Sequence, residues 1–164
     1  MSESMHSLRR IHEELWDPVV GLERYAPGAV PGVDISPFNL HSIRESALGA
    51  FLDFQDGNTS RAIKTIKALL HHQCRDAGVP WFGTFKVTAE QADPPSTGAE
   101  MWFHYDPNWR QFVGCILAIN LIVFGEDIPT ELHSIILDSL ELCVGGEPAD
   151  RLPSWYTNPN PMHA

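Results

Sequence analysis

The sequence is poor in positive charge. It has 11 lysine and arginine residues against 21 aspartate and glutamate residues, a formal net charge of −10 over 164 residues. Proteins that bind nucleic acids neutralise phosphates mainly with lysine and arginine, so this imbalance argues against a nucleic-acid partner. It argues equally against adsorption to an anionic membrane surface.

Cysteine is scarce as well. The three cysteines, Cys74, Cys115 and Cys143, are far apart and form no CxxC pair. An odd and scattered set argues against a disulfide framework and against a structural zinc site. The P-loop, GxGxxG, GxSxG, HExxH and EF-hand motifs are also absent from the sequence. We therefore expect no metal and no cofactor, and we expect the cysteines to be buried as small apolar side chains.

Long hydrophobic runs are missing too. The longest, residues 112–124, is short for a membrane helix and is interrupted by Gly114 and Asn120. The first 16 residues have apolar side chains at helical spacing and lack the apolar core of a signal peptide. The sequence thus predicts a cytoplasmic protein without a membrane partner, folded as one domain over residues 1–164.

What the sequence does contain is a series of amphipathic segments. Apolar residues recur with a helical period in five of them, and each predicts a helix: residues 4–16, 36–54, 59–78, 106–124 and 130–146. The fourth segment is apolar nearly all the way round, which predicts burial on most sides. Residues 18–35 and 78–105 lack the period and are expected to be irregular loops, the longer one with room for a short β-hairpin.

Two of these predicted helices share the same kind of start with the last residues of the chain, NPNPMHA, which resemble the first turn of a sixth helix. Ser36-Pro37, Asp106-Pro107 and Asn158-Pro159 each pair a capping residue with a proline at the first helical position. Two of them continue into a helix, a short link and a second helix that is more amphipathic. This order predicts an all-α domain of helical hairpins in two layers, either a partial α/α toroid or an α-solenoid, with the long loops at one end.

The stretch YDPNWRQFVGCILAINLIVFGEDIP, followed by YTNPNPMHA, resembles a group of fungal proteins over roughly residues 100–164. In helix pattern that group is similar to six-hairpin, glycosidase-like toroids. The resemblance implies a catalytic cleft at the long-loop end, in an architecture whose enzymes act mostly on carbohydrates and some on isoprenoids or other small molecules. Six hairpins would need about 300 residues. The two hairpins predicted here therefore indicate a shortened relative, a truncated product, or a protomer that completes its core by self-association.

The densest cluster of aromatic and polar residues, MWFHYDPNWR, lies where the long loop meets the fourth helix. Histidine changes charge near neutral pH, so His104 is the candidate acid–base residue. Asp106 is either a general base or the cap of the helix, and the cap is the simpler interpretation. Trp102 and Tyr105 are candidate ligand-stacking residues.

The end of the same motif has simpler roles. Trp109 lies inside the predicted helix and is expected in the core, and Arg110 is expected to form a surface ion pair with Asp106 or a nearby glutamate. Outside the motif, Trp81, Tyr156 and Asn158 are further candidate ligand-binding residues, because their loops are predicted at the same end.

Two other pairs of titratable residues stand out in the sequence. Glu90 and Glu100 share the long loop and are a weak candidate for the carboxylate pair of a glycoside hydrolase. His71 and His72 are expected to be exposed to solvent. The sequence thus leaves two classes of function open. One is an enzyme that acts on a small molecule or a sugar by acid–base chemistry, and the other is a non-catalytic helical-repeat binding or accessory protein, or an inactive truncated relative.

Overall fold

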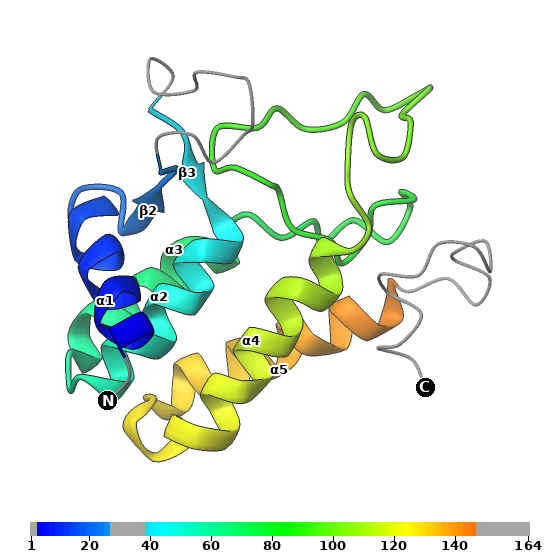
Figure 1. The fold of residues 1–164 in the computed structure, drawn as a ribbon. Coiled ribbons are helices and arrows are strands. Elements are labelled where there is room, and N and C mark those ends of the chain that lie inside the picture. The colour runs from blue at the N-terminus through cyan, green and yellow to red at the C-terminus, as the bar shows by residue number, and fades with distance from the viewer. Residues whose placement is uncertain (1–2, 27–38, 147–164) are drawn as a thin grey trace.

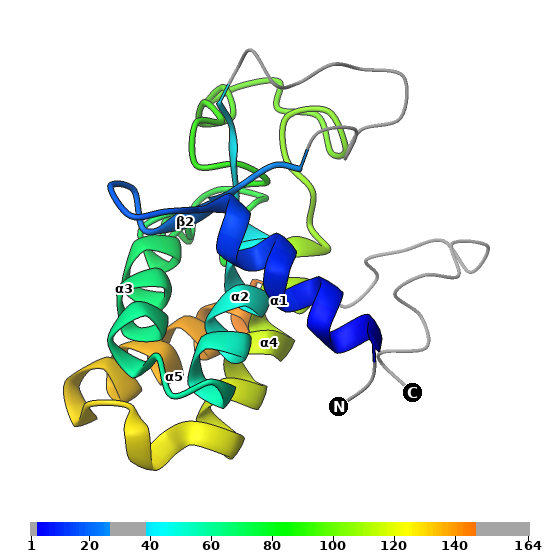
Figure 2. The same cartoon turned by 60° about the vertical axis from the view of Figure 1, so that its left-hand side comes forward.

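The structure is a computed structural model that describes residues 3–26 and 39–146 (Figures 1 and 2). Its elements, in chain order, are α1 (Glu3–Leu15), β1 (Trp16–Asp17), β2 (Leu22–Arg24), β3 (His41–Ser42), α2 (Ile43–Gln55), α3 (Thr59–Leu70), α4 (Trp109–Phe124), the 3-10 helix η2 (Gly125–Asp127) and α5 (Thr130–Gly145). The expected helix-rich fold is confirmed. The expectation of an all-α protein is incomplete, because β1, β2 and β3 form a small antiparallel sheet.

Four of the helices form two hairpins, α2–α3 and α4–α5, that lie side by side (Figure 1). The helices α2 and α4 pack on each other and run in the same direction, and α3 contacts α5. Each helix contributes fully buried side chains to one shared core, including Ala47, Ile66, Leu117 and Ile136. Burying an aliphatic side chain of leucine or isoleucine size stabilises a fold by about 1.5–3 kcal/mol, so this core holds the two hairpins together.

The helix α2 begins later than the sequence predicted. The expected start at Ser36-Pro37 lies outside the described residues, but residues 39–42, which were predicted to be helical, are extended or irregular. Ser42 has an extended backbone, and its hydroxyl accepts a hydrogen bond from the backbone N–H of Glu45, so Ser42 is the N-cap. The helix α3 likewise ends at Leu70, eight residues before the predicted end at 78.

The sheet is built from segments that were predicted to be loop and helix. In it β2 lies between β1 and β3, with Glu23 opposite Trp16 on one side and opposite Ser42 on the other. The expectation of an irregular loop over residues 18–35 is therefore wrong at β2. Strands of two or three residues are too short to show a period of two in the sequence.

The long loop before α4 forms no hairpin of its own. Isolated bridges connect it to other parts of the fold, Thr88 to Ser42 and Phe85 to Gln73. A third bridge, between Met101 and Tyr105, closes a tight turn within the loop. The loop thus packs on the ends of the sheet and of α3, and this packing creates the site described below.

The helix α4 is buried on one side only. Val113 and Leu117 have no exposed surface, whereas Ile122 and Val123 are 82% and 55% exposed. The expectation of burial on most sides is wrong, because within the described chain α4 packs mainly on α2 and α5. By length and composition alone Trp109–Asp127 could cross a membrane, but a third of it is buried inside the protein, and core helices of soluble proteins pass the same test.

Candidate functional site

A cavity of about 490 Å³ lies where the segment after α3 meets the loop before α4. Its walls come from residues 71–76, from the turn at Trp81, from residues 84–86, from residues 91–96 and from His104 and Tyr105. The structure therefore brings three of the predicted site residues, Trp81, His104 and Tyr105, to one cavity. The volume is within the range of about 300–1,000 Å³ that is typical of small-molecule sites.

Trp81 and Tyr105 form an aromatic wall of this cavity. Their ring centroids are 5.5 Å apart and their planes are tilted by 47°. Each residue is 8% exposed, and both belong to the cavity lining. An aromatic pair of this kind adds about 0.5–1.5 kcal/mol beyond the burial of its area, which makes the wall rigid.

Arg110 of α4 holds the turn that carries Trp81. Its Nε donates to the carbonyl oxygen of Phe82 over 2.7 Å, and its Nη2 donates to the carbonyl oxygen of Pro80 over 3.0 Å. These two carbonyls flank Trp81 in the sequence. Arg110 is 1% exposed, so the expectation that it lies at the surface is wrong. Its guanidinium instead satisfies buried backbone acceptors, which need donors in the absence of water.

The same turn packs closely on the end of α5. Gly83 has a φ of +75°, and a Cβ atom there would lie 2.0 Å from the carbonyl oxygen of Leu142. A residue other than glycine would therefore meet both backbone strain and a collision. The position of Trp81 thus depends on α4 and on α5, two core helices, as well as on its own loop.

Gln73 lines the cavity from the segment after α3. Its Nε2 donates to the carbonyl oxygens of Gly83 and Ser139 over 3.1 and 3.0 Å, which fixes the orientation of the amide. Gln73 is 7% exposed, and its Oε1 is buried without a hydrogen-bond partner in the described structure. Leaving a buried acceptor without a donor costs about 1–3 kcal/mol.

His104 and Asp106 have different surroundings. The Nδ1 of His104 accepts a hydrogen bond from the backbone N–H of Glu100 over 3.0 Å. A neutral imidazole that accepts at Nδ1 carries its hydrogen on Nε2, so His104 offers a donor. The Oδ1 of Asp106 accepts from the backbone N–H of Asn108 over 2.9 Å, just before α4 begins, and Asp106 is not part of the cavity lining. The helix α4 begins at Trp109 with Asn108 as its N-cap, so the expected helix start at Asp106-Pro107 and the expected cap at Asp106 are wrong. The carboxylate of Asp106 instead closes a turn just before the helix.

The other predicted site residues that the structure describes do not join this group. Trp102 is 48% exposed, has a φ of 71° and lies outside the cavity lining. Tyr156 and Asn158 lie outside the described residues. Glu90 is engaged elsewhere, because its carboxylate binds the backbone N–H and the Nδ1 of His41 over 2.9 and 2.6 Å. Glu100 is exposed.

Several basic groups that were not predicted line the same cavity. Lys86 pairs with Asp93 over 2.9 Å, and the Asp93 side chain is 86% exposed. Arg75 is exposed and forms no ion pair with any described residue. His72 is half-buried, contrary to expectation, and burial lowers its pKa, as do the nearby charges of Lys86 and His71. His72 and Arg75 fall inside the helix predicted over residues 59–78, which gave no sign that they would meet the long loop.

The comparison with protein families gives one match. A family described as a domain of unknown function (DUF8769) matches residues 13–164. The chain belongs to this family. Comparisons with curated proteins and with solved structures gave no match. The family range contains every residue of the cavity, and it brings no activity with it, so the function has to be argued from the site.

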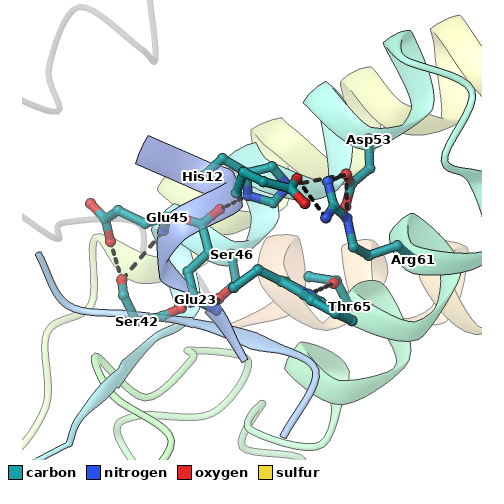
Figure 3. A network of polar contacts seen from close by, with 10 residues as sticks. His12, Glu23, Ser42, Glu45, Ser46, Asp53, Arg61 and Thr65 are labelled. Carbon is teal, nitrogen blue, oxygen red and sulfur yellow. Dashed lines mark hydrogen bonds and ion pairs between the residues drawn. The ribbon is translucent and has the colours of Figure 1, made fainter. Parts of the chain in front are cut away.

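A second polar cluster is buried between α1, β2 and the α2–α3 hairpin (Figure 3). The Nδ1 of His12 lies 2.6 Å from the Oε1 of Glu23, and its Nε2 lies 3.0 Å from the Oδ1 of Asp53. Arg61 donates to the same Asp53 oxygen over 2.7 Å. Burial lowers the pKa of His12, but the hydrogen bonds to Asp53 and Glu23 outweigh this effect and raise the pKa to about 9. His12 is therefore protonated at neutral pH.

This cluster is a structural tie. Both ring nitrogens of His12 are engaged by carboxylates, and the residue is 4% exposed, so it has no free group for a ligand. The packing leaves room only for glycine at position 49, where a Cβ atom would lie 1.9 Å from the Oε1 of Glu23. Arg61 belongs to the same cluster, through its ion pair with Asp53.

A related arrangement lies along the sheet. Asp17 receives hydrogen bonds from the backbone N–H groups of Val19 and Val20 and from Arg24, and its Oδ2 lies 3.4 Å from the Nε2 of His41. Burial raises the pKa of Asp17, but these bonds outweigh it and lower the pKa to about 2. Within the described residues no group of three or more histidine, cysteine, aspartate or glutamate side chains is arranged to hold a metal ion. Both clusters thus stabilise the fold around the site.

Proposed function

We propose that the protein binds a small organic molecule in the cavity lined by Trp81, His104 and Tyr105. The observation that carries the proposal is a cavity of about 490 Å³ whose lining includes the Trp81–Tyr105 aromatic pair beside polar side chains such as His104. Apolar walls with a few converging polar groups are the usual form of a small-molecule site. The anchoring of the walls by Arg110 supports binding further, because a preorganised site loses little entropy when it is filled.

The polar groups favour binding over acid–base turnover by His104 and Asp106. His104 uses its Nδ1 as an acceptor from the backbone, so its Nε2 is a donor in the neutral ring. Asp106 directs a carboxylate oxygen to the start of α4. A hydrogen-bond donor beside an aromatic wall recognises a ligand without needing to transfer a proton. A non-catalytic binding or accessory protein is therefore the function we favour.

An enzyme is the second candidate, and His72 is the observation in its favour. Burial and the neighbouring cations lower the pKa of His72, so at neutral pH it is an unprotonated base that lines the cavity. If the cavity is catalytic, His72→Gln retains binding and loses turnover, with a pH profile that follows the imidazole in the wild type. Turnover that survives this substitution excludes His72 as the base.

We also propose a finer architecture, a partial α/α toroid or an α-solenoid. Its support is that α2 and α4 run in the same direction and are each followed by an antiparallel partner (Figure 1). Repeats of helical hairpins stack in this way. A solved structure in which the two hairpins cross at a steep angle, without a common layer order, would exclude this architecture.

The binding proposal is tested by ligand-observed NMR. A library of monosaccharides, aromatic acids and polar heteroaromatic compounds is screened against the wild type, Tyr105→Ala and Trp102→Ala. Tyr105 lines the cavity and Trp102 does not. We expect ligands whose signals are lost with Tyr105→Ala and retained with Trp102→Ala, both variants being folded by circular dichroism. A wild type that binds nothing, or ligands insensitive to Tyr105, would reject the proposal.

A further inference from the structure

We infer that the protein has a second binding site, a groove between α3 and α5, whose ligand is a small amphipathic anion, an alkyl chain with a carboxylate at one end. The groove has a volume of about 440 Å³, which is within the range of small-molecule sites. It shares His71, Gln73 and Arg75 with the cavity described above. The residues that line only the groove are Lys67, Leu70, Leu132 and Ile135. The inference does not depend on the proposed function of the cavity.

The floor of the groove is aliphatic. Leu70, at the end of α3, is 6% exposed, and Leu132 of α5 is 1% exposed. Ile135 lies one turn further along α5 and is 38% exposed, so part of the floor is open to solvent. The described lining contains no phenylalanine, tyrosine or tryptophan on which a flat ring could stack. An alkyl chain suits this floor, because each methylene that leaves the water adds to the affinity.

The rim of the groove is basic. Lys67 and His71 are exposed one turn apart at the end of α3, and Arg75 follows four residues later. Among the lysine and arginine residues that the structure describes, Lys67 and Arg75 are the two without an ion pair or a side-chain hydrogen bond. Six of the others pair with carboxylates, and Lys64 and Arg110 donate to backbone carbonyls. The lining of the groove, as far as the structure describes it, includes no aspartate or glutamate.

Neither the charge of the chain nor the end of the helix accounts for both cations. Acidic residues outnumber basic ones by 21 to 11, so carboxylates are in excess. The helix dipole favours a cation in the last turn of α3, where Lys67 lies, but Arg75 lies beyond the end of that helix. Asp76, the neighbour of Arg75, accepts a hydrogen bond from the backbone N–H of Gly78 over 2.8 Å. Two uncompensated cations beside an aliphatic floor are thus complementary to an alkyl carboxylate.

Four probes separate the contribution of the alkyl chain from that of the charge. Octanoate has both, hexanoate has a shorter chain, octan-1-ol lacks the charge, and octylammonium carries the opposite charge. Ligand-observed NMR at constant low salt, below the micelle concentration, measures their binding. We expect octanoate to bind most tightly, hexanoate about fivefold to tenfold more weakly, octan-1-ol about fivefold more weakly, and octylammonium not at all. Equal affinities of octanoate and octan-1-ol would overturn the inference, because the basic rim would then have no effect.

Substitutions in the rim and in the floor locate the site. Lys67→Gln should weaken octanoate binding about threefold to fivefold, whereas Arg10→Gln, which removes an exposed cation of α1 outside the groove, should leave it unchanged. Ile135→Ser should weaken it about fivefold or more, whereas Ile122→Ser, on an exposed position of α4, should not. If Lys67 only stabilises the end of α3, its substitution changes the stability and leaves the affinity of the folded protein as it was.

The outcomes distinguish this inference from the proposed function of the cavity. If octanoate binding is lost with Tyr105→Ala and retained with Lys67→Gln and Ile135→Ser, the ligand lies in the cavity and the groove inference is wrong. If octanoate does not bind and a peptide rich in leucine and glutamate binds in a way that depends on Lys67, the ligand class is wrong, because the occupant is a protein segment. Octanoate binding that no variant changes is nonspecific and overturns the inference. If octanoate binds as expected and no library compound depends on Tyr105, the proposed function of the cavity is rejected and the inference stands.

Discussion

The guanidinium of Arg110 donates to the carbonyl oxygen of Phe82 over 2.7 Å, although the two residues are 28 positions apart. With the second bond to Pro80, it fixes the backbone on both sides of Trp81. The wall of the cavity is therefore set by a buried side chain of α4. A site whose backbone is hydrogen-bonded to a core helix is held more rigidly than one formed by a loop alone.

Arg110→Met should lower the free energy of unfolding by about 2–4 kcal/mol. The substitution retains an apolar stem but leaves the carbonyls of Phe82 and Pro80 buried without donors. Urea unfolding measures the change. The control is Arg75→Met, which alters an exposed residue and should stay within about 0.5 kcal/mol of the wild type. Equal values for the two variants would show that Arg110 does not hold the turn.

Gly49→Ala should also destabilise the protein, by about 2–4 kcal/mol. The added Cβ atom would lie 1.9 Å from the Oε1 of Glu23 and 2.6 Å from the ring of His12, so the buried pair would have to separate. Gly145→Ala is the matched control, since the nearest atom to its Cβ would be 3.8 Å away. There we expect no loss, and up to about 1 kcal/mol of gain from helix propensity. Thermal or urea unfolding of both variants decides the matter.

The helices could be predicted from sequence because their signal is local. In α3 and α5 the apolar side chains recur with a helical period, and the turns at Asp56–Asn58 and at Gly145-Gly146 mark boundaries. The late start of α2 could have been read from Ser42 and Glu45, a serine followed three positions later by a glutamate, which is the pattern of a capping box. Pro37 favoured an earlier start, because proline is common at the first position of a helix.

The sheet and the polar clusters could not be predicted in this way. His12 looked like part of a solvated helix face, and it is buried because its partners lie 11 and 41 residues away in the sequence. Only some of the residues that line the cavity could be predicted, because the others come together through contacts between distant parts of the sequence. Trp81, His104 and Tyr105 stand out as aromatic and polar residues in loops, whereas Gln73 is singled out only by an unsatisfied atom in the folded structure.

Because α4 is buried on one side only, substitutions on its two sides should differ in their effect on stability. Leu117→Ala removes a side chain with no exposed surface and should cost about 2–5 kcal/mol, since it loses buried area and leaves a cavity. Ile122→Ala alters a side chain that is 82% exposed and should change stability by less than about 0.5 kcal/mol. Both are measured by urea unfolding. Similar costs at the two positions would mean that α4 is covered on both sides in solution.

Stability should fall as the pH rises from about 6.5 to about 9. The folded pKa of His12 is raised from the ordinary 6.5 to about 9, so the unfolded chain loses this proton first. The contribution of His12 is therefore complete below pH 6.5 and is lost as the pH passes through the folded pKa. A difference of this size is worth on the order of 3 kcal/mol. His72, whose pKa burial lowers, affects stability below 6.5 and does not mask the change.

Urea unfolding at several pH values across this interval tests the assignment of the slope to His12. The slope should disappear in His12→Gln, which has no titrating group between Glu23 and Asp53 and should be less stable than the wild type at pH 6.5. It should remain in His6→Gln, because His6 is exposed on the same helix. The comparison separates the buried imidazolium from any general effect of net charge, since both variants remove one histidine. If His6→Gln and His12→Gln give the same profile, the buried ion pairs do not control the response, and the tie between α1, β2 and α2 rests on packing alone.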